Sequence, residues 1–141
     1  MTRAVPDRSQ RRQKRARRGV AATEFAVCLP VLVLLLLGMI EACSMVFLKQ
    51  SLACAAYEGA HTALAPGATS SDVRRVCEQI LADRRVAGAT ITINPTNIEG
   101  MPEGEYLEVQ VSAPTDRNGF IPGRFFQGQT LSSTAVMMKE I

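Results

Sequence analysis

The sequence has little of what enzyme active sites are usually built from. It contains one histidine, His61, and no tryptophan, and none of its four cysteines form a C-x-x-C pair. It also has no P-loop, no dinucleotide-binding glycine pattern and no H-E-x-x-H motif. No spacing typical of metal ligands occurs, and no Ser or Asp arrangement surrounds His61. We therefore predict that the chain is not an enzyme and has no catalytic residue, no metal and no cofactor.

Positive charge is scarce after Gly19 and dense before it. The first eighteen residues hold eight cations and one acid, Asp7, which gives a net charge of +7, so the rest of the chain carries −4 within a total of +3. Such a basic segment could bind nucleic acid. However, it lacks interleaved aromatic residues and directly precedes an apolar run. Targeting and membrane topology explain it more simply, and we predict no nucleic-acid partner.

The apolar run from Phe25 to Leu48 contains a single charge, Glu41. A helix of about 20 apolar residues crosses the hydrocarbon core of a bilayer. Cations stay on the cytoplasmic side, and the cationic cluster lies at the N-terminal flank. We therefore predict a basic cytoplasmic leader (1–19), a transmembrane helix (20–48) and an extracytoplasmic module (49–141), in a single-pass protein of the bacterial inner membrane.

Other N-terminal signals fit less well. The apolar run exceeds the 7–15 residues of a secretory signal peptide. The pair Arg17 and Arg18 could belong to a twin-arginine signal, but the apolar run is too long and too hydrophobic for one. Cys43 and Cys54 follow the wrong residues for a lipoprotein.

Two acids interrupt the apolar segment. Glu24 comes five residues after Gly19, at the start of the run. It is either a functional acid or a head-group residue that suits the helix dipole. Glu41 follows seventeen residues later, about 25 Å along a helix axis, so the two lie near opposite interfaces. Glu41 either contacts a partner or marks the outer boundary of the span.

The N-terminal residues resemble a known family. The segment R-R-G-V-A-A-T-E-F-A-V-C-L-P, a Leu-rich run ending G-M-I-E, and A-C-A-A-Y-E-G-A are similar to TadE-like minor pseudopilins of tight-adherence (Tad, type IVb) pili. The resemblance implies cleavage between Gly19 and Val20 by a prepilin peptidase. It also implies that Glu24, followed by Phe25, pairs with the N-terminal amine of a neighbouring subunit. Its implied partners are other pilin-like subunits and Tad inner-membrane assembly proteins.

The rest of the chain predicts an α+β, pilin-like module. The long helix continues to Pro66 with a stripe of mostly small residues, Ala53, Ala56, Ala60 and Leu64. Ser70, Ser71 and Asp72 can cap a second helix over 73–86, which Gly88 stops. Alternating segments at 89–94, 106–112 and 131–139 then predict a small three-stranded antiparallel sheet.

Two features of the module leave alternatives open. Cys54 and Cys77 could form a disulfide in an oxidising compartment, or could be free buried thiols. The stretch 114–129 holds Phe120, Phe125 and Phe126, which either bind a partner or cap the open edge of the sheet; we favour the cap.

Two hypotheses for function follow. The first is a structural or assembly subunit of a Tad-type pilus or secretion machine that is processed at Gly19, is membrane-bound and can associate with the pilus in cell adhesion. The second is an uncleaved single-pass envelope protein whose outer module binds a ligand or serves as an accessory to an enzyme.

Overall fold

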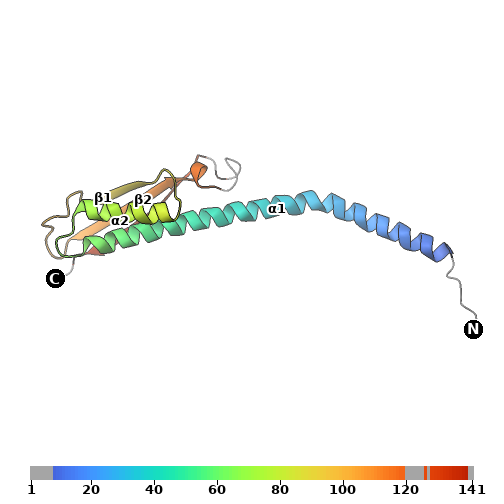
Figure 1. The fold of residues 1–141 in the computed structure, drawn as a ribbon, viewed down its shortest axis with the longest axis horizontal. Coiled ribbons are helices and arrows are strands. Elements are labelled where there is room, and N and C mark those ends of the chain that lie inside the picture. The colour runs from blue at the N-terminus through green and yellow to red at the C-terminus, as the bar shows by residue number, and fades with distance from the viewer. Residues whose placement is uncertain (1–7, 120–125, 127, 140–141) are drawn as a thin grey trace, which may run out of the picture. The chain divides into compact units, whose positions relative to one another are not determined.

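The computed structural model describes residues 8–119, 126 and 128–139, with side chains from Gly19 onward. Its elements are two helices, three strands and one 3-10 turn, in the order α1, α2, β1, β2, η1, β3 (Figure 1). The chain forms two compact units, Met1–Met39 and Ile40–Ile141. The helix α1 (Arg8–Ala63) contributes to both. This confirms the predicted long apolar helix, second helix and small sheet. The second unit begins nine residues before the start of the module predicted from hydropathy.

Between Phe25 and Met39, in the first unit, α1 is apolar on all sides. Its large hydrophobic side chains from Val20 to Leu36 are between 44% and 72% exposed. Pro30 lies inside the helix without ending it. In the described part of the chain, one helical stretch, within Gly19–Ala63, has the length and composition to cross a membrane. A continuous apolar surface of this size is stable only against lipid or other apolar segments.

In the second unit, α1 buries one face and exposes the other. Its buried side chains recur every three or four residues, which is the pattern of a helix with one face in a core. They are Met45, Leu48, Leu52, Ala55, Ala56, Ala60 and Ala63. The predicted stripe is correct for Ala56 and Ala60 but wrong for Ala53, which is exposed. Leu48 and Leu52 determine which face is buried, and Ala53 lies outside that face.

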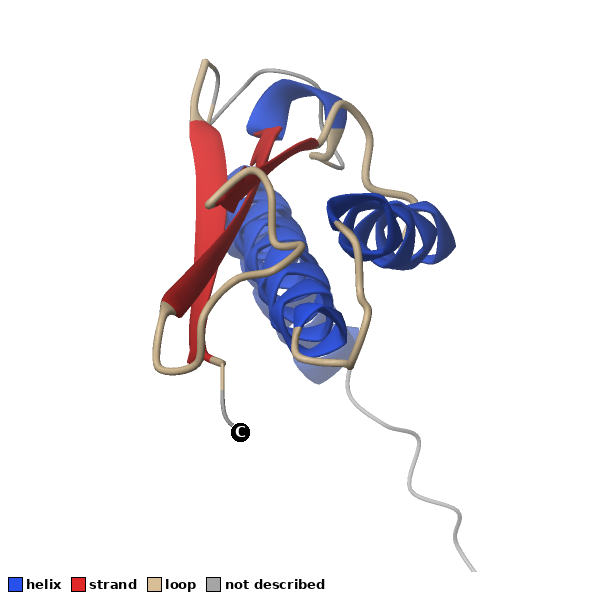
Figure 2. Cartoon of the chain, turned by 90° about the vertical axis from the view of Figure 1, so that its left-hand side faces the viewer, coloured by secondary structure: helices blue, strands red, loops and turns tan. Residues whose placement is uncertain are grey.

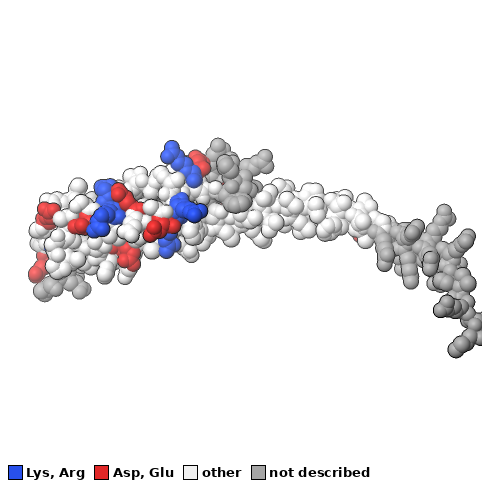
Figure 3. Space-filling view, in the orientation of Figure 1, with Lys and Arg blue, Asp and Glu red and all other residues white. Residues whose placement is uncertain are grey.

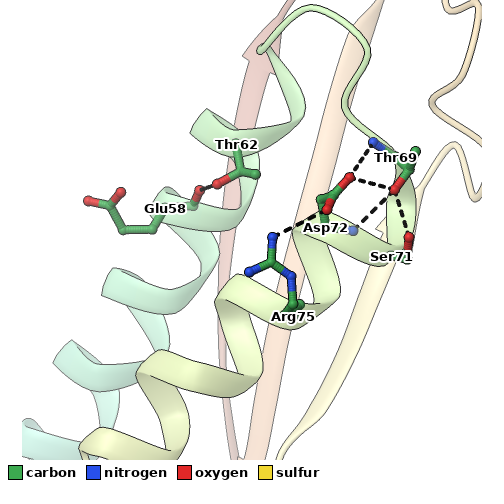
Figure 4. A network of polar contacts seen from close by, with 6 residues as sticks. All are labelled: Glu58, Thr62, Thr69, Ser71, Asp72 and Arg75. Carbon is green, nitrogen blue, oxygen red and sulfur yellow. Dashed lines mark hydrogen bonds and ion pairs between the residues drawn. The ribbon is translucent and has the colours of Figure 1, made fainter.

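The second helix, α2 (Ser70–Asp83), begins three residues earlier than predicted. Its N-cap is Thr69, whose hydroxyl accepts a hydrogen bond from Asp72 N at 3.3 Å (Figure 4). Thr69 N in turn donates to Asp72 Oδ2 at 3.2 Å, which completes a capping box. Asp72 also pairs with the Arg75 guanidinium at 3.3 Å. Hydrogen bonds from Thr69, and then Arg75, lower the pKa of Asp72.

The predicted end of α2 is wrong, because the helix stops at Asp83 rather than near Gly88. Arg85 adopts a left-handed conformation with a φ of 56°. Arg85 N donates to Ala82 O at 2.9 Å, and Val86 N donates to Leu81 O at 2.8 Å. These two bonds form a Schellman motif, in which the position of Arg85 is usually taken by glycine.

The sheet consists of β1 (Thr90–Asn94), β2 (Tyr106–Pro114) and β3 (Thr130–Met138), antiparallel and in that order. Its register pairs Ile91 with Val111 and Ile93 with Val109. These residues, with Leu107, are buried on one face as the alternation predicted. The turn η1 (Thr115–Arg117) follows β2 directly.

Both helices lie on the same face of the sheet (Figure 2). Lys49 Nζ on α1 donates to Ser132 O on β3, and Arg74 Nη1 on α2 donates to Ile91 O on β1 at 3.4 Å. The helices meet at Gly59, where a Cβ would stand 2.4 Å from Cys77 Sγ and 3.4 Å from Val109 Cγ1. Glycine is therefore required at position 59, because Cys77 of α2 lies too close for a side chain there. At this point α1 packs against both α2 and the sheet.

Cys54 and Cys77 are free thiols in the structure, and the disulfide that the sequence left open stays a prediction. Cys77 Sγ is fully buried and donates to Ala55 O at 3.2 Å, whereas Cys54 Sγ lies 3.6 Å from Arg84 Nη2. The two sulfur atoms thus have separate partners. The alternative prediction, a buried free thiol, describes Cys77. Burial raises the pKa of Cys77 to about 11.

The contact at Gly59 predicts a specific coupling between two substitutions. Gly59→Ala should lower the free energy of unfolding by about 1–3 kcal/mol, because the new methyl group overlaps Cys77 Sγ. In a Cys77→Ala background the same change should be neutral or stabilising, because alanine favours helix over glycine by about 1 kcal/mol. Thermal unfolding of the full chain in detergent, followed by circular dichroism, measures both. Equal destabilisation in the two backgrounds would contradict this packing.

The environment of Cys77 predicts its reactivity. At pH 8 its thiol should stay unmodified by a maleimide in the folded protein, because it is inaccessible and its raised pKa keeps it protonated. The partly exposed Cys54 should react, and all four cysteines should react in denaturant without a reductant. Mass spectrometry of the labelled peptides reads out each site. A linked peptide containing both Cys54 and Cys77 would show that a disulfide forms after all.

Candidate functional site

Gly19 and Val20 lie within α1, one helical position apart, and both are exposed. A Cβ on Gly19 would meet no atom within 4 Å. Glycine inside a helix destabilises it by roughly 0.5–1 kcal/mol relative to alanine, so packing within the described chain gives no reason for glycine here. The Thr23 hydroxyl donates to Gly19 O at 2.9 Å, beside the peptide bond between Gly19 and Val20.

Glu24 and Phe25 are exposed on the same unit, and Phe25 is 60% accessible. Glu24 is four residues after Val20, so the two share a helix face and are separated by about 6 Å along the axis. No described residue of the chain itself forms a hydrogen bond or ion pair with the Glu24 side chain. The carboxylate lies among exposed apolar side chains.

Glu41 is placed differently from Glu24. Its side chain is only 3% exposed and lies within the second unit. Its Oε1 atom is 2.9 Å from where a Cβ on Gly119 would stand, so the residues after η1 approach α1 closely at this point. The carboxylate is therefore accommodated inside its own chain. Sequence reasoning gave no sign of this contact, because Glu41 and Gly119 are 78 positions apart in the chain.

The phenylalanine-rich stretch after β2 is only partly described. Phe120 and Phe125 lie outside the described residues, so the prediction that they cap the sheet stays a prediction. Phe126 is half-buried, and its carbonyl accepts a hydrogen bond from Thr115 Oγ1 at 2.6 Å.

The single histidine, His61, contacts an aromatic ring. His61 is exposed and stacks on Tyr57, with ring centroids 6.4 Å apart and planes 15° from parallel. Among the residues whose side chains are described, no group of three His, Cys, Asp or Glu side chains could hold a metal ion.

One grouping was not predicted from the sequence. Arg84 and Arg85 at the end of α2, and Arg117 in η1, line a cavity of about 160 Å³ beside Phe47 and Leu48 of α1. The pair R-R was visible in the sequence, but Arg117 lies more than thirty residues later. Only the fold brings the three together.

Comparison with known proteins identifies the first part of this structure. Residues 19–61 match the family model of TadE-like proteins, which confirms the resemblance predicted from the sequence. No curated protein and no solved structure matches the chain. Members of this family are structural proteins associated with Tad pili. The match begins at Gly19, includes Glu24 and extends to the part of α1 that packs in the module, so residues 19–61 of the chain are similar to TadE-like proteins.

Proposed function

We propose that the protein is a minor pseudopilin of a Tad-type pilus or secretion machine, anchored in the inner membrane by α1 with its module outside the cytoplasm. A prepilin peptidase removes the leader between Gly19 and Val20, and Glu24 then pairs with the N-terminal amine of a neighbouring pilin-like subunit. The observation that carries this proposal is the family match that begins at Gly19, on a helix whose following residues are apolar on every side.

The charge distribution supports the proposed topology. The basic leader precedes the apolar helix, and Lys49 is the first cation after it. Positive segments are retained on the cytoplasmic side, which leaves the module outside.

The properties of Gly19 support processing at this bond. Nothing in the described chain packs against it, so its lack of a side chain serves no contact within the protein. A small residue before the cut is what a peptidase with a restricted pocket would select. Because Gly19 O is hydrogen bonded to Thr23 within a helix, cleavage requires local unwinding of α1.

The position of Glu24 supports its role in assembly. Cleavage creates an α-amine at Val20 whose usual pKa of about 7.7–8.0 leaves it mostly protonated near neutral pH. Either the amine or the carboxylate is costly to place alone among apolar helices, and pairing the two across subunits lowers that cost. The exposed Phe25 would add apolar contact beside the pair. A fixed offset between amine and carboxylate also sets the register of neighbouring helices.

Processing predicts a defined N-terminus. Protein purified from the membranes of cells with an active prepilin peptidase should begin at Val20, as measured by intact-mass spectrometry. Gly19→Val should leave most of the protein uncleaved, because a branched side chain then precedes the bond. The matched control is Gly38→Val, since a Cβ at Gly38 also meets no atom within 4 Å. An intact N-terminus in the unsubstituted protein would favour an uncleaved envelope protein instead.

Pairing predicts that assembly depends on the charge of Glu24. Glu24→Gln should reduce the amount of pilin-like subunits that co-purify by about tenfold or more, because loss of one partner of a buried pair costs roughly 3 kcal/mol or more. Cleavage should continue in this variant. Glu58→Gln, on the exposed part of the same helix, is the matched control and should co-purify normally. Normal co-purification of Glu24→Gln would exclude the pairing.

A further inference from the structure

The cavity beside Phe47 and Leu48 has an unusual charge. Arg84, Arg85 and Arg117 line it, with Val86, Asn118 and Gly119. All three arginines are exposed, and the Arg84 guanidinium donates to Cys54 Sγ at 3.6 Å. One carboxylate borders the lining, because Glu41 Oε1 lies 2.9 Å from the position of a Cβ on Gly119; that carboxylate is buried. Three cations thus surround a small space within a unit that is otherwise rich in acids.

The fold holds these cations in place. Asn118 Oδ1 accepts a hydrogen bond from Ala87 N at 2.8 Å, and Asn118 Nδ2 donates to Ala87 O at 2.9 Å. This pair of bonds ties the segment after η1 to the segment after α2. The stem of Arg117 lies against Gly88, with its Cδ atom 3.3 Å from where a Cβ would stand. The arginines are therefore brought together by specific contacts.

Arg85 occupies a position at which its backbone conformation is unfavourable. Its φ of 56° is in the left-handed region, which costs a non-glycine residue roughly 1–2 kcal/mol. Glycine would complete the same Schellman motif without that cost. Strain of this kind is concentrated at functional sites, where the side chain itself is needed.

The cavity also lies where the helix leaves the bilayer in the proposed topology. If hydrocarbon begins near Phe25, a core crossed by about 20 residues ends near Ser44. Phe47 and Leu48 are then about 5–6 Å farther out, within the head-group layer, which is of similar thickness. Phe47 is 53% exposed and offers apolar surface beside the arginines. Figure 3 shows blue and red side chains interspersed on the second unit.

We infer that Arg84, Arg85 and Arg117 form a binding site for the phosphate of an anionic phospholipid in the outer leaflet of the inner membrane. Guanidinium groups bind phosphate oxygens through charge-assisted hydrogen bonds. The cavity of about 160 Å³ holds a group of roughly five heavy atoms, if each takes the 30 Å³ of a water molecule. The exposed Phe47 and the half-buried Val86 contact the glycerol and upper acyl region of the same lipid. This site depends on the proposed membrane anchoring but not on cleavage or subunit pairing.

The test uses the full chain in detergent and two probes, phosphatidylglycerol and phosphatidylcholine with the same acyl chains. Native mass spectrometry gives the ratio of their apparent binding constants. We expect phosphatidylglycerol to bind at least tenfold more tightly. Arg84→Gln/Arg85→Gly/Arg117→Gln should reduce this preference to about twofold or less, since each surface cation contributes about fivefold. The control Arg74→Gln/Arg75→Gln/Lys139→Gln removes the same charge elsewhere on the unit and should keep the preference.

A single substitution separates binding from folding. Arg85→Gly should weaken phosphatidylglycerol binding about fivefold while the melting temperature stays the same or rises, because glycine relieves the left-handed strain. Loss of both binding and stability would mean that Arg85 is only structural and would overturn the inference.

Three further outcomes decide against the site. An equal preference in the two triple variants would mean that net charge alone attracts lipid. Displacement of phosphatidylglycerol by inorganic phosphate at about equal concentration would mean that the site binds free phosphate rather than lipid. A normal lipid preference in the first triple variant, together with lost co-purification of pilin-like subunits, would assign the cluster to a protein partner. If the leader is not cleaved, its eight cations attract phosphatidylglycerol equally in every variant, so the difference between the two triple variants still measures the cavity.

Discussion

The structure depends on one helix, α1, that must suit two different environments in turn. Between Phe25 and Met39 its surface is apolar on all sides, and after Ile40 it buries only one face against α2 and the sheet. The second environment is the more restrictive, because α2 approaches α1 so closely at Gly59 that a Cβ there would stand 2.4 Å from Cys77 Sγ. The small residues around this point, Ala55, Ala56 and Ala60, allow that approach along two turns. The module is thus assembled directly on the continuation of the apolar helix.

This arrangement places the polar features of the chain at the change of environment. Glu41 is at the start of the second unit and is buried against the segment after η1. The same segment contains Asn118, which binds the residues after α2. The end of the sheet, the end of α2 and the first turn of the packed part of α1 therefore meet at one place. The arginine cavity exists because these three segments converge there.

The features predicted correctly from the sequence are those with a local signal. The apolar run, the two-residue alternation of the strands and the order of elements are periodic patterns, and each patterned segment forms the expected element. The end of α2 was not predictable in the same way, because Gly88 is the obvious helix stop and Arg85 takes the left-handed position instead. Ala53 was placed on the wrong face, since alanine alone does not fix the phase of a helix and Leu48 with Leu52 does.

The functional features divide along the same line. The proposed leader, Gly19 and Glu24 lie within a few residues of each other, so charge, spacing and the family resemblance predict their roles without a fold. The contact of Glu41 with the Gly119 segment and the grouping of Arg84 with Arg117 join positions far apart in sequence. No local pattern predicts such contacts, because they result from how the sheet and α2 end relative to α1.

The two cationic regions of the chain have opposite fates in the proposed sequence of events. The leader holds eight cations on the cytoplasmic side, where they resist movement of the helix through the membrane. Cleavage at Gly19 removes all of them and leaves Glu24 and the new α-amine of Val20 as the charges in the first half of α1. The arginine cavity, by contrast, stays with the mature protein on the other side. In this proposal, contact with lipid head groups at the cavity holds the helix at a defined depth. This contact is reversible, whereas the cations of the leader could not cross the membrane. In the proposed sequence of events, processing would replace an anchor that prevents outward movement with one that permits it.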